Sequence, residues 1–456
     1  MTGLLVANVL YLAIGVGLLP VLRIARTRGE LLARLPLAYL VGVAGAGILA
    51  AHLALIEVPV GIVELVVLAA VVLFAGLRRV RAGRGDAGGE FVLADPPWSR
   101  ALGGAALLAA AVLLLHAWRT YAIRPLLEWD GWAIWGTRAR ALYEFGGATG
   151  PVFTTEPYLP LQHPLLLPTL EAINHRALGL YEPTTVRVQL AVLAIGFLLA
   201  FVGLLRDRVP AFLVGLVALA VLAAEPVLRQ LSTNLADVPL ALFVALGLIG
   251  LGRWLTSGET WPLAAAVVFL GAAALTKSEG LFFTLAALLA LAPVAWRRWR
   301  PLAIAAGAIA AIVLPWRLFV SLRDLPLVEY EFSNALSPAY LAEHSDRVGP
   351  AVRGLGGEIL SGEWGLLVPV FLVALAAAAT ARRWALVAFA ASWAALAFAG
   401  LVLVYWISVI PIELALVWSG DRTIVTVVVG AASLAALLAG EAYRGSVRNA
   451  ANAGLR

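Results

Sequence analysis

The chain has 456 residues, of which 62% are hydrophobic and 13% charged, and its mean hydropathy is +0.94. This composition excludes an ordinary soluble domain and indicates a membrane protein. The absence of cysteine excludes disulfides, thiolate nucleophiles and cysteine-ligated metals. The net charge of +6 comes almost wholly from arginine, because Lys277 is the only lysine. With no basic stripe interleaved with aromatic residues, this charge predicts contact with membrane lipids and no nucleic-acid partner.

Apolar runs divide the chain in a regular way. A helix needs about 17 to 25 apolar residues to cross a hydrocarbon core. Runs of this length, or slightly shorter, lie near 3–22, 36–56, 59–77, 100–118, 186–205, 209–224, 238–252, 262–276, 281–296, 301–319, 365–380, 384–409 and 421–441. The sequence therefore predicts an all-α polytopic membrane protein with about 13 transmembrane helices.

Arginine is concentrated in alternate connections between these runs. The arginine-rich segments are 23–34, 78–84, 206–208, 253, 297–300, 382–383 and the tail from 444. Because cytoplasmic connections carry the excess of positive charge, the alternation predicts an external N-terminus and a cytoplasmic C-terminus. The intervening connections 119–185, 225–237, 276–280, 320–364 and 410–420 are then external. We expect a multi-pass protein of the inner or plasma membrane whose site faces the external or periplasmic side.

The stretch LEWDGWAIW (127–135) opens the first long external connection. Trp132, Trp135, Ala139, Leu142 and Phe145 recur at helical spacing, which predicts an interfacial helix with its tryptophans at the depth of the lipid headgroups. The tryptophans alone require no more than membrane anchoring.

Two carboxylates, Glu128 and Asp130, stand one residue apart in the same stretch. One acid at this place could simply cap the helix or pair with a nearby arginine. A cap needs one acid and not two, so we interpret the pair as a candidate site in which one carboxylate takes a proton and the other positions a partner.

Further ionisable residues lie in the other external connections. Asp237, two residues before Pro239, is either a helix cap or a site residue. Lys277 and Glu279 stand at an apolar boundary in LTKSEGL. Arg422 is the last residue of SGDR, at the outer end of the last apolar run. His163 lies in a proline-rich return, where a structural role is favoured over a catalytic one. The histidines lack the spacing of a metal site, so we expect no cofactor, and a divalent metal is allowed but not indicated.

Taken in order, several motifs between about residues 100 and 425 resemble those of a known superfamily. These motifs are EWDGWAIWGTRARA, HPLLLPTLEA, STNLADVPLALF, LTKSEGLFF and SGDR. They resemble the GT-C superfamily of integral-membrane glycosyltransferases, which includes protein O-mannosyltransferases, aminoarabinose transferases and the catalytic subunit of oligosaccharyltransferase. The E-x-D-x-W is similar to the acidic motif in the first external loop of the last of these.

The resemblance implies a donor in which a sugar is linked to polyprenyl phosphate, and it places Asp130 on the superfamily's first-loop catalytic acid. It also suggests a division into 1–98 (three N-terminal helices and a cytoplasmic linker), 99–425 (a catalytic module with external loops 119–185 and 320–364) and 426–456 (the rest of the last helix and a tail). The chain departs from the pattern in its three extra N-terminal spans and in lacking a large C-terminal soluble domain and a WWD-type motif. Recognition of a protein sequon is therefore not implied.

These features predict an inverting glycosyltransferase, specifically a hexosyl- or pentosyltransferase. It would move a sugar from a polyprenyl-phosphate donor to a hydroxyl of a cell-envelope lipid, glycan or protein. We expect Asp130 and Glu128 to be catalytic and Lys277, Arg422 and Arg138 to bind the donor phosphate. Asp237, Glu279, His163 and Trp132 are expected to support the site.

Two other functions fit parts of the pattern. Ionisable groups at span ends also mark the pathways of lipid or solute transporters and flippases. A glycan polymerase or ligase that uses pyrophosphate-linked oligosaccharides would use external arginines, and Arg323, Arg347 and Arg353 lie in the loop 320–364.

Overall fold

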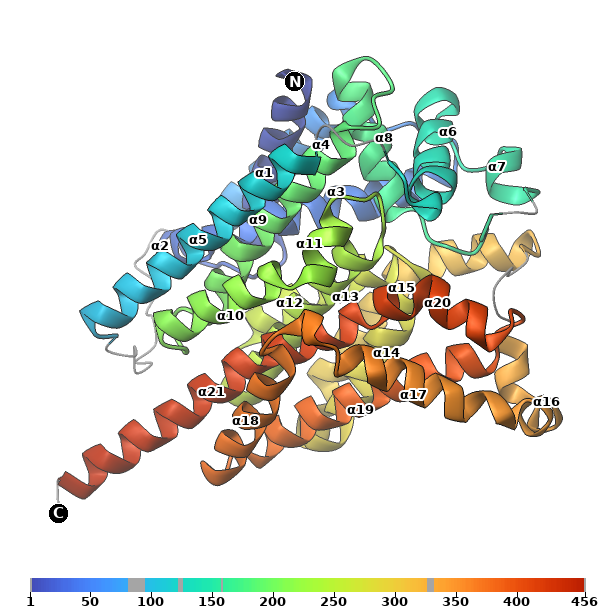
Figure 1. Ribbon diagram of the computed structural model, residues 1–456. Helices are drawn as coiled ribbons and strands as arrows, with labels where there is room; N and C mark the ends of the chain where they lie inside the picture. The colour runs from blue at the N-terminus through green and yellow to red at the C-terminus, as the bar shows by residue number, and fades with distance from the viewer. Residues whose placement is uncertain (1, 81–94, 122–125, 157–158, 326–331, 455–456) are drawn as a thin grey trace.

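The computed structural model describes residues 2–80, 95–121, 126–156, 159–325 and 332–454 (Figure 1). These residues form helices of varied length joined by turns, and no β-strand occurs among them. The expectation of an all-α protein is therefore confirmed.

Every predicted apolar run contains a helix. These are α1 (Thr2–Val21), α3 (Ala38–Ala54), α4 (Ile62–Arg79), α5 (Pro97–Tyr121), α9 (Thr185–Leu205), α10 (Ala211–Ala223), α12 (Asp237–Ser257), α13 (Thr260–Ala274), α14 (Ser278–Val294), α15 (Trp299–Leu322), α18 (Leu367–Thr380), α19 (Trp384–Trp406) and α21 (Val425–Gly454). Eight helices of the described chain are long and apolar enough to cross a membrane, or ten if each of two bent pairs forms one span. The helices α13 and α14 are shorter. The count of thirteen crossings thus remains a prediction.

Shorter helices occupy the connections between the long ones. They are α2 (Arg28–Arg34), η1 (Leu35–Leu37), the π-helix η2 (Asp130–Gly136), α6 (Thr137–Phe145), α7 (Pro151–Thr154), α8 (Leu166–Leu178), α11 (Glu225–Leu231), η3 (Trp296–Arg298), η4 (Phe332–Leu336), α16 (Pro338–Glu343), η5 (Ser345–Arg347), α17 (Val348–Ile359), η6 (Gly362–Trp364) and α20 (Ile412–Thr423). The predicted external connections are therefore largely helical.

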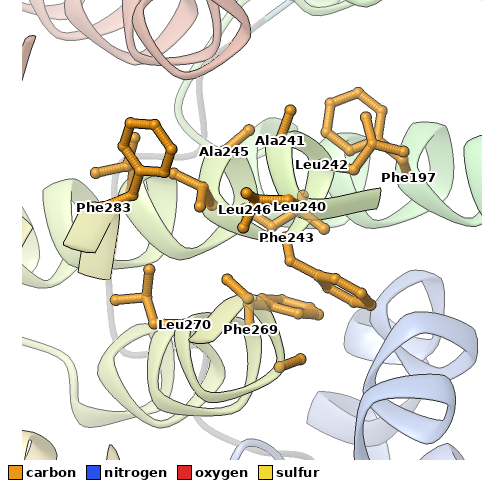
Figure 2. Close-up of a cluster of buried hydrophobic side chains, with 14 of the residues drawn as sticks. Phe197, Leu240, Ala241, Leu242, Phe243, Ala245, Leu246, Phe269, Leu270 and Phe283 are labelled. Atoms are coloured by element: carbon orange, nitrogen blue, oxygen red, sulfur yellow. The ribbon is translucent and has the colours of Figure 1, made fainter. Parts of the chain in front are cut away.

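The helix α12 lies at the centre of the molecule, and nearly all of its residues are buried. Figure 2 shows side chains of α12 packed between those of α9, α13 and α14. The rings of Phe243 in α12 and Phe269 in α13 stack with their centroids 6.4 Å apart. Because helices inside a membrane gain little from exclusion of water, close packing of this kind holds them together. A central helix that cannot shift gives the residues at its two ends fixed positions.

The N-terminal helices pack into the same hydrophobic core as the rest of the chain. A side chain on Gly15 of α1 would lie 1.7 Å from a carbonyl oxygen of α3, so glycine is required where these helices meet. Asn8 of α1 accepts a hydrogen bond of 2.6 Å from Tyr39 of α3 and donates one of 3.1 Å to Gln189 of α9. Residues 81–94 of the predicted linker lie outside the described residues, so the division at residue 98 remains a prediction.

The arginine-rich connections gather at one end of the bundle. The guanidinium of Arg253, near the end of α12, bonds to Asp207 at 2.5 and 2.7 Å and lies 3.6 Å from Glu259. Arg26 donates to Thr260 at 3.0 Å, and Arg206 donates to the carbonyl of Ala33 at 2.5 Å. These contacts join segments that the sequence assigns to the cytoplasmic side, as the alternation of charge predicts.

The predicted external segments lie toward the opposite end. Asp237 starts α12 and Arg253 lies sixteen residues later, which corresponds to about 24 Å along a helix. In Figure 1, α6, α7, α16 and α20 lie on the right, whereas the C-terminal end of α21 lies at the lower left. The two ends of the bundle therefore carry different charged residues: the arginine-rich turns lie at one end and the acidic motifs at the other.

A bend between α10 and α11 carries the second external connection back over the bundle. The helix axis turns by 64° at Ala224, whose backbone is extended. Pro226 has no backbone N–H to donate to the carbonyl of Leu222, so α10 cannot continue through it, whereas proline is well tolerated in the first turn of α11. The bend directs α11 toward α20 and α12 instead of away from them.

Candidate functional site

A cavity of about 770 Å³ opens at the end of the bundle that carries the acidic motifs. Its walls come from η2, α11, α14, α19 and α20 and from the start of α12. Most of the predicted site residues line it, namely Glu128, Asp130, His163, Asp237, Lys277, Glu279 and Arg422. The sequence motifs that lie far apart along the chain therefore meet around one space.

Asp130 forms an ion pair across the cavity. Its Oδ2 accepts a hydrogen bond of 2.7 Å from Nη1 of Arg422 in the last turn of α20. The side chains of Asp130 and Arg422 keep 28% and 18% of their surface exposed, so the pair faces the cavity and is open to a ligand. No side chain caps η2, which excludes the interpretation of Asp130 as a helix cap in this structure.

Lys277 lies deeper and is held by two carboxylates. Its Nζ is 2.8 Å from Oδ1 of Asp237 and 3.2 Å from Oε1 of Glu279, and all three side chains are almost fully buried. Burial alone would lower the pKa of Lys277, but the two carboxylates raise it above its ordinary value. The lysine is therefore a permanent cation that neutralises Asp237 and Glu279, and Asp237 is more than a cap.

Glu128 lines the cavity beside Asp130 but faces another partner. Its charge acts on Arg187, a buried arginine at the start of α9. The two acids of the E-x-D motif thus interact with different cations, because Asp130 is bonded to Arg422 and the charge of Glu128 acts on Arg187.

Arg138 and Trp132 do not line the cavity, and their roles as a phosphate ligand and a supporting residue remain predictions. Arg138 is fully buried in α6, with its guanidinium 5.4 Å from the centroid of Phe153, and none of its nitrogens has a hydrogen-bond partner in the described chain. Burial lowers the pKa of Arg138 to about 9. Trp132 is half exposed and contacts Trp129 edge to face, at 6.3 Å between centroids. A helical repeat cannot distinguish the face of α6 that packs inward from one that lines a cavity.

The predicted interfacial helix packs against the protein over much of its apolar face. Trp135, Ala139 and Leu142 are buried, and α6 packs against α8. Only Trp132 and Phe145 of this face are exposed and available to lipid. The location of η2 and α6 in a membrane interface therefore remains a prediction that rests on these two residues.

His163 has a structural environment. Its ring stacks on Trp135 at 5.3 Å between centroids, and Nδ1 lies 2.9 Å from the hydroxyl of Ser278. Burial, with Lys277 and Arg138 nearby, holds the pKa of His163 well below its ordinary value. A neutral histidine bonded in this way joins the proline-rich return to the start of α14.

Several cavity residues were not singled out from the sequence. Arg229 of α11 pairs with Asp421 at 2.7 Å and lies 3.9 Å from Glu363 of η6. Arg229 is one of several arginines in the connections assigned to the external side, and no sequence pattern distinguishes it from the others. Gln230 and Tyr405 also line the cavity, and no sequence pattern distinguishes them from ordinary helix residues.

A buried hydrogen-bond network holds the backbone of the E-x-D motif. The amide Nδ2 of Asn234 donates to the carbonyl of Gly131 at 3.0 Å and to Oε2 of Glu171 in α8 at 3.1 Å. A Cβ on Gly131 would lie 3.3 Å from the backbone nitrogen of Asn234, so the two segments touch. Burial raises the pKa of Glu171 to about 8, an effect that the bond from Asn234 partly offsets. The position of Asp130 therefore depends on a carboxyl group that is protonated near neutral pH.

Glu171→Gln tests this network. An acid whose pKa is raised on folding stabilises the protein below its ordinary value of 4.5, and that stability is lost as the pH rises to about 8. Glutamine resembles the protonated acid and still accepts from Asn234. Thermal unfolding in detergent should therefore show a smaller loss of stability between pH 6 and pH 8 in Glu171→Gln than in the wild type. Glu144→Gln, which changes an exposed pair, should keep the wild-type slope, and an unchanged slope in both variants would contradict the assignment.

No group of three or more histidine, aspartate or glutamate side chains is placed to hold a metal ion within the described ranges. Comparisons with models of protein families, with curated proteins and with solved structures found no match to this chain. The fold and the composition define the class: the chain is a multi-pass integral membrane protein whose described residues form helices and connecting turns without β-strands, with a charged cavity at one end of the bundle.

Proposed function

We propose that the protein is an inverting glycosyltransferase that uses a polyprenyl-phosphate-linked sugar. The observation that carries the proposal is the Asp130 carboxylate paired with Arg422 at 2.7 Å inside a cavity with aromatic and aliphatic walls. Transfer of a sugar to an alcohol requires a base near the acceptor hydroxyl and a cation near the departing phosphate. The pair supplies both, and the apolar wall suits a lipid-linked donor.

The chemical step uses these two residues in turn. Five acidic and three basic side chains line the cavity, and the basic ones are already paired, so a phosphate must displace a carboxylate from a cation. The Arg229–Asp421 pair at the rim is the most exposed of the three, and the Asp130–Arg422 pair is more exposed than the Lys277 pairs. We assign the phosphate to Arg422 because its partner is the proposed base. When the phosphate takes Arg422, Asp130 is released to act as the base.

The acceptor oxygen then attacks the anomeric carbon while its proton moves to Asp130. The bond between the anomeric carbon and the phosphate oxygen breaks, and its electrons leave with the polyprenyl phosphate, which Arg422 stabilises. A single displacement of this kind inverts the configuration. In this mechanism Lys277 is a structural counter-ion for Asp237 and Glu279, and Arg229 is a second exchangeable cation at the rim.

Purified protein should be incubated with radiolabelled polyprenyl-phosphate sugars and hydroxyl acceptors. We expect at least one labelled sugar to appear on an acceptor with release of polyprenyl phosphate. Passage of an unchanged donor across a proteoliposome membrane would instead support a transporter. Consumption of pyrophosphate-linked oligosaccharides alone would support a polymerase or ligase, for which Arg347, in contact with the backbone of Ser408 at the cavity wall, is a candidate.

The external position of the cavity is part of the proposal and has its own test. Single cysteines can be introduced at exposed positions because the chain has none of its own. Cysteine at Thr155, between α7 and the proline-rich return, should react with a membrane-impermeant thiol reagent in intact cells. Cysteine at Thr380, beside the arginine-rich turn after α18, should react only after permeabilisation. The reverse pattern would place the cavity on the cytoplasmic side.

A further inference from the structure

Gln230 is a buried amide without a partner. Its side chain is 1% exposed, it lines the cavity, and neither its Nε2 nor its Oε1 has a hydrogen-bond partner in the part of the chain that the structure describes. A buried polar group left unpaired is destabilising, so such groups in a native protein generally bond to a ligand or to water. In contrast, the charged groups of the same cavity are largely paired with one another.

A cluster of hydroxyl groups lines the same cavity. The hydroxyl of Tyr405 in α19 is 2.8 Å from Oγ of Ser419 and 3.2 Å from Oγ1 of Thr423, both in α20. Ser419 donates its proton to the carbonyl of Ala415, and Thr423 donates its proton to the carbonyl of Ser419. Tyr405 therefore donates within the cluster, and the lone pairs that remain can accept from a ligand hydroxyl.

We propose that Gln230 is a specificity residue that binds sugar hydroxyls, with the Tyr405 cluster as a second polar contact. A carboxamide offers one donor and one acceptor side by side, which matches two adjacent hydroxyls of a sugar ring. A neutral group of this kind also binds a sugar without competing for the phosphate held by Arg422. The inference rests on the proposed function, and the sugar belongs either to the donor lipid or to a glycan acceptor.

Loss of Gln230 should remove recognition of the sugar and leave recognition of the lipid phosphate. Two neutral hydrogen bonds at about 0.5–1.5 kcal/mol each correspond to roughly a 5- to 150-fold change in affinity. In Gln230→Leu we expect a loss of this size for the sugar-bearing lipid and little change for the bare polyprenyl phosphate. The wild type should bind the sugar-bearing lipid more tightly than the bare one.

The experiment measures binding in nanodiscs by calorimetry for short-chain polyprenyl phosphate, bare or carrying mannose, glucose or arabinofuranose. Asn174→Leu is the matched control, because Asn174 is equally buried and also has an unpartnered amide but does not line the cavity. Gln230→Met, which keeps the approximate length, stays neutral and loses both the donor and the acceptor, serves if Gln230→Leu does not fold. Binding of octyl glycosides of the same sugars is measured in parallel, because these compounds represent a glycan acceptor.

The sugar-dependent difference should vanish in Gln230→Leu and persist in Asn174→Leu. If the variant loses affinity only for the octyl glycosides, Gln230 binds the acceptor sugar instead of the donor sugar. The inference would be overturned if Gln230→Leu bound both the lipid-linked sugars and the octyl glycosides with wild-type affinity. It would also be overturned if the wild type bound no sugar-bearing lipid more tightly than the bare lipid and bound no octyl glycoside. Because these are binding measurements, they stay separate from the transfer assay: sugar-dependent binding without transfer would contradict only the proposed chemistry.

Discussion

Asp130→Asn is expected to abolish sugar transfer while the donor lipid still binds. Asparagine keeps the shape of the side chain, and its carbonyl oxygen can still accept a hydrogen bond from Arg422. It cannot take the proton of the acceptor hydroxyl at neutral pH. Loss of a general base typically lowers the rate by about 10²–10⁴-fold. Initial rates with the accepted donor, together with donor affinity measured by calorimetry, check both halves of the expectation.

Two variants of the same chemical type control this experiment. Glu128→Gln changes the other acid of the motif, which acts on Arg187, and should lower the rate less than Asp130→Asn. Glu144→Gln changes an exposed carboxylate that pairs with Arg140 outside the cavity and should leave the rate unchanged. An inactive Glu128→Gln beside an active Asp130→Asn would reverse the two roles. Full activity in both Asp130→Asn and Glu128→Gln would show that neither acid of the E-x-D motif takes part in catalysis.

Lys277→Met is expected to destabilise the protein strongly. The substitution removes the cation that lies 2.8 Å from Asp237 and 3.2 Å from Glu279, and it leaves two buried carboxylates without that partner. Removal of one member of a buried ion pair typically costs about 3–5 kcal/mol. Thermal unfolding in detergent should therefore show a large drop in the transition temperature of the variant.

Neutralising Lys277, Asp237 and Glu279 together distinguishes a structural role of Lys277 from a role in binding the donor. In the triple variant Lys277→Met, Asp237→Asn and Glu279→Gln none of the three side chains carries a charge. Arg422, on which Asp237 also acts, keeps its pair with Asp130, so most of the lost stability should return. The triple variant should also bind the donor lipid better than Arg422→Ala, because Arg422 is the proposed phosphate ligand. A triple variant that is stable but has lost the donor as completely as Arg422→Ala would reassign the phosphate to Lys277.

The sequence by itself determined the class of protein and the place of its helices. Hydropathy is a local property, so each apolar run, from 3–22 to 421–441, contains a helix in the structure. The alternation of arginine-rich connections is also readable along the chain, and it correctly grouped Arg206, Arg253 and their neighbours at the end away from Asp237. Charged residues that interrupt apolar sequence are costly to place in a membrane, which is why Glu128, Asp130, Lys277 and Arg422 stand out in the sequence alone.

Only the tertiary structure decided which charges meet and which residues face the cavity. Asp130 and Arg422 are 292 positions apart, and no local pattern encodes their contact. Arg138 satisfied the same sequence criteria as Arg422, yet the packing of α6 buries it away from the cavity. Gln230 reaches the cavity because α11 turns by 64° from α10. Hydropathy and helix propensity act over a few residues, whereas pairing and burial depend on how distant helices pack, and for that reason the site became visible only in the folded chain.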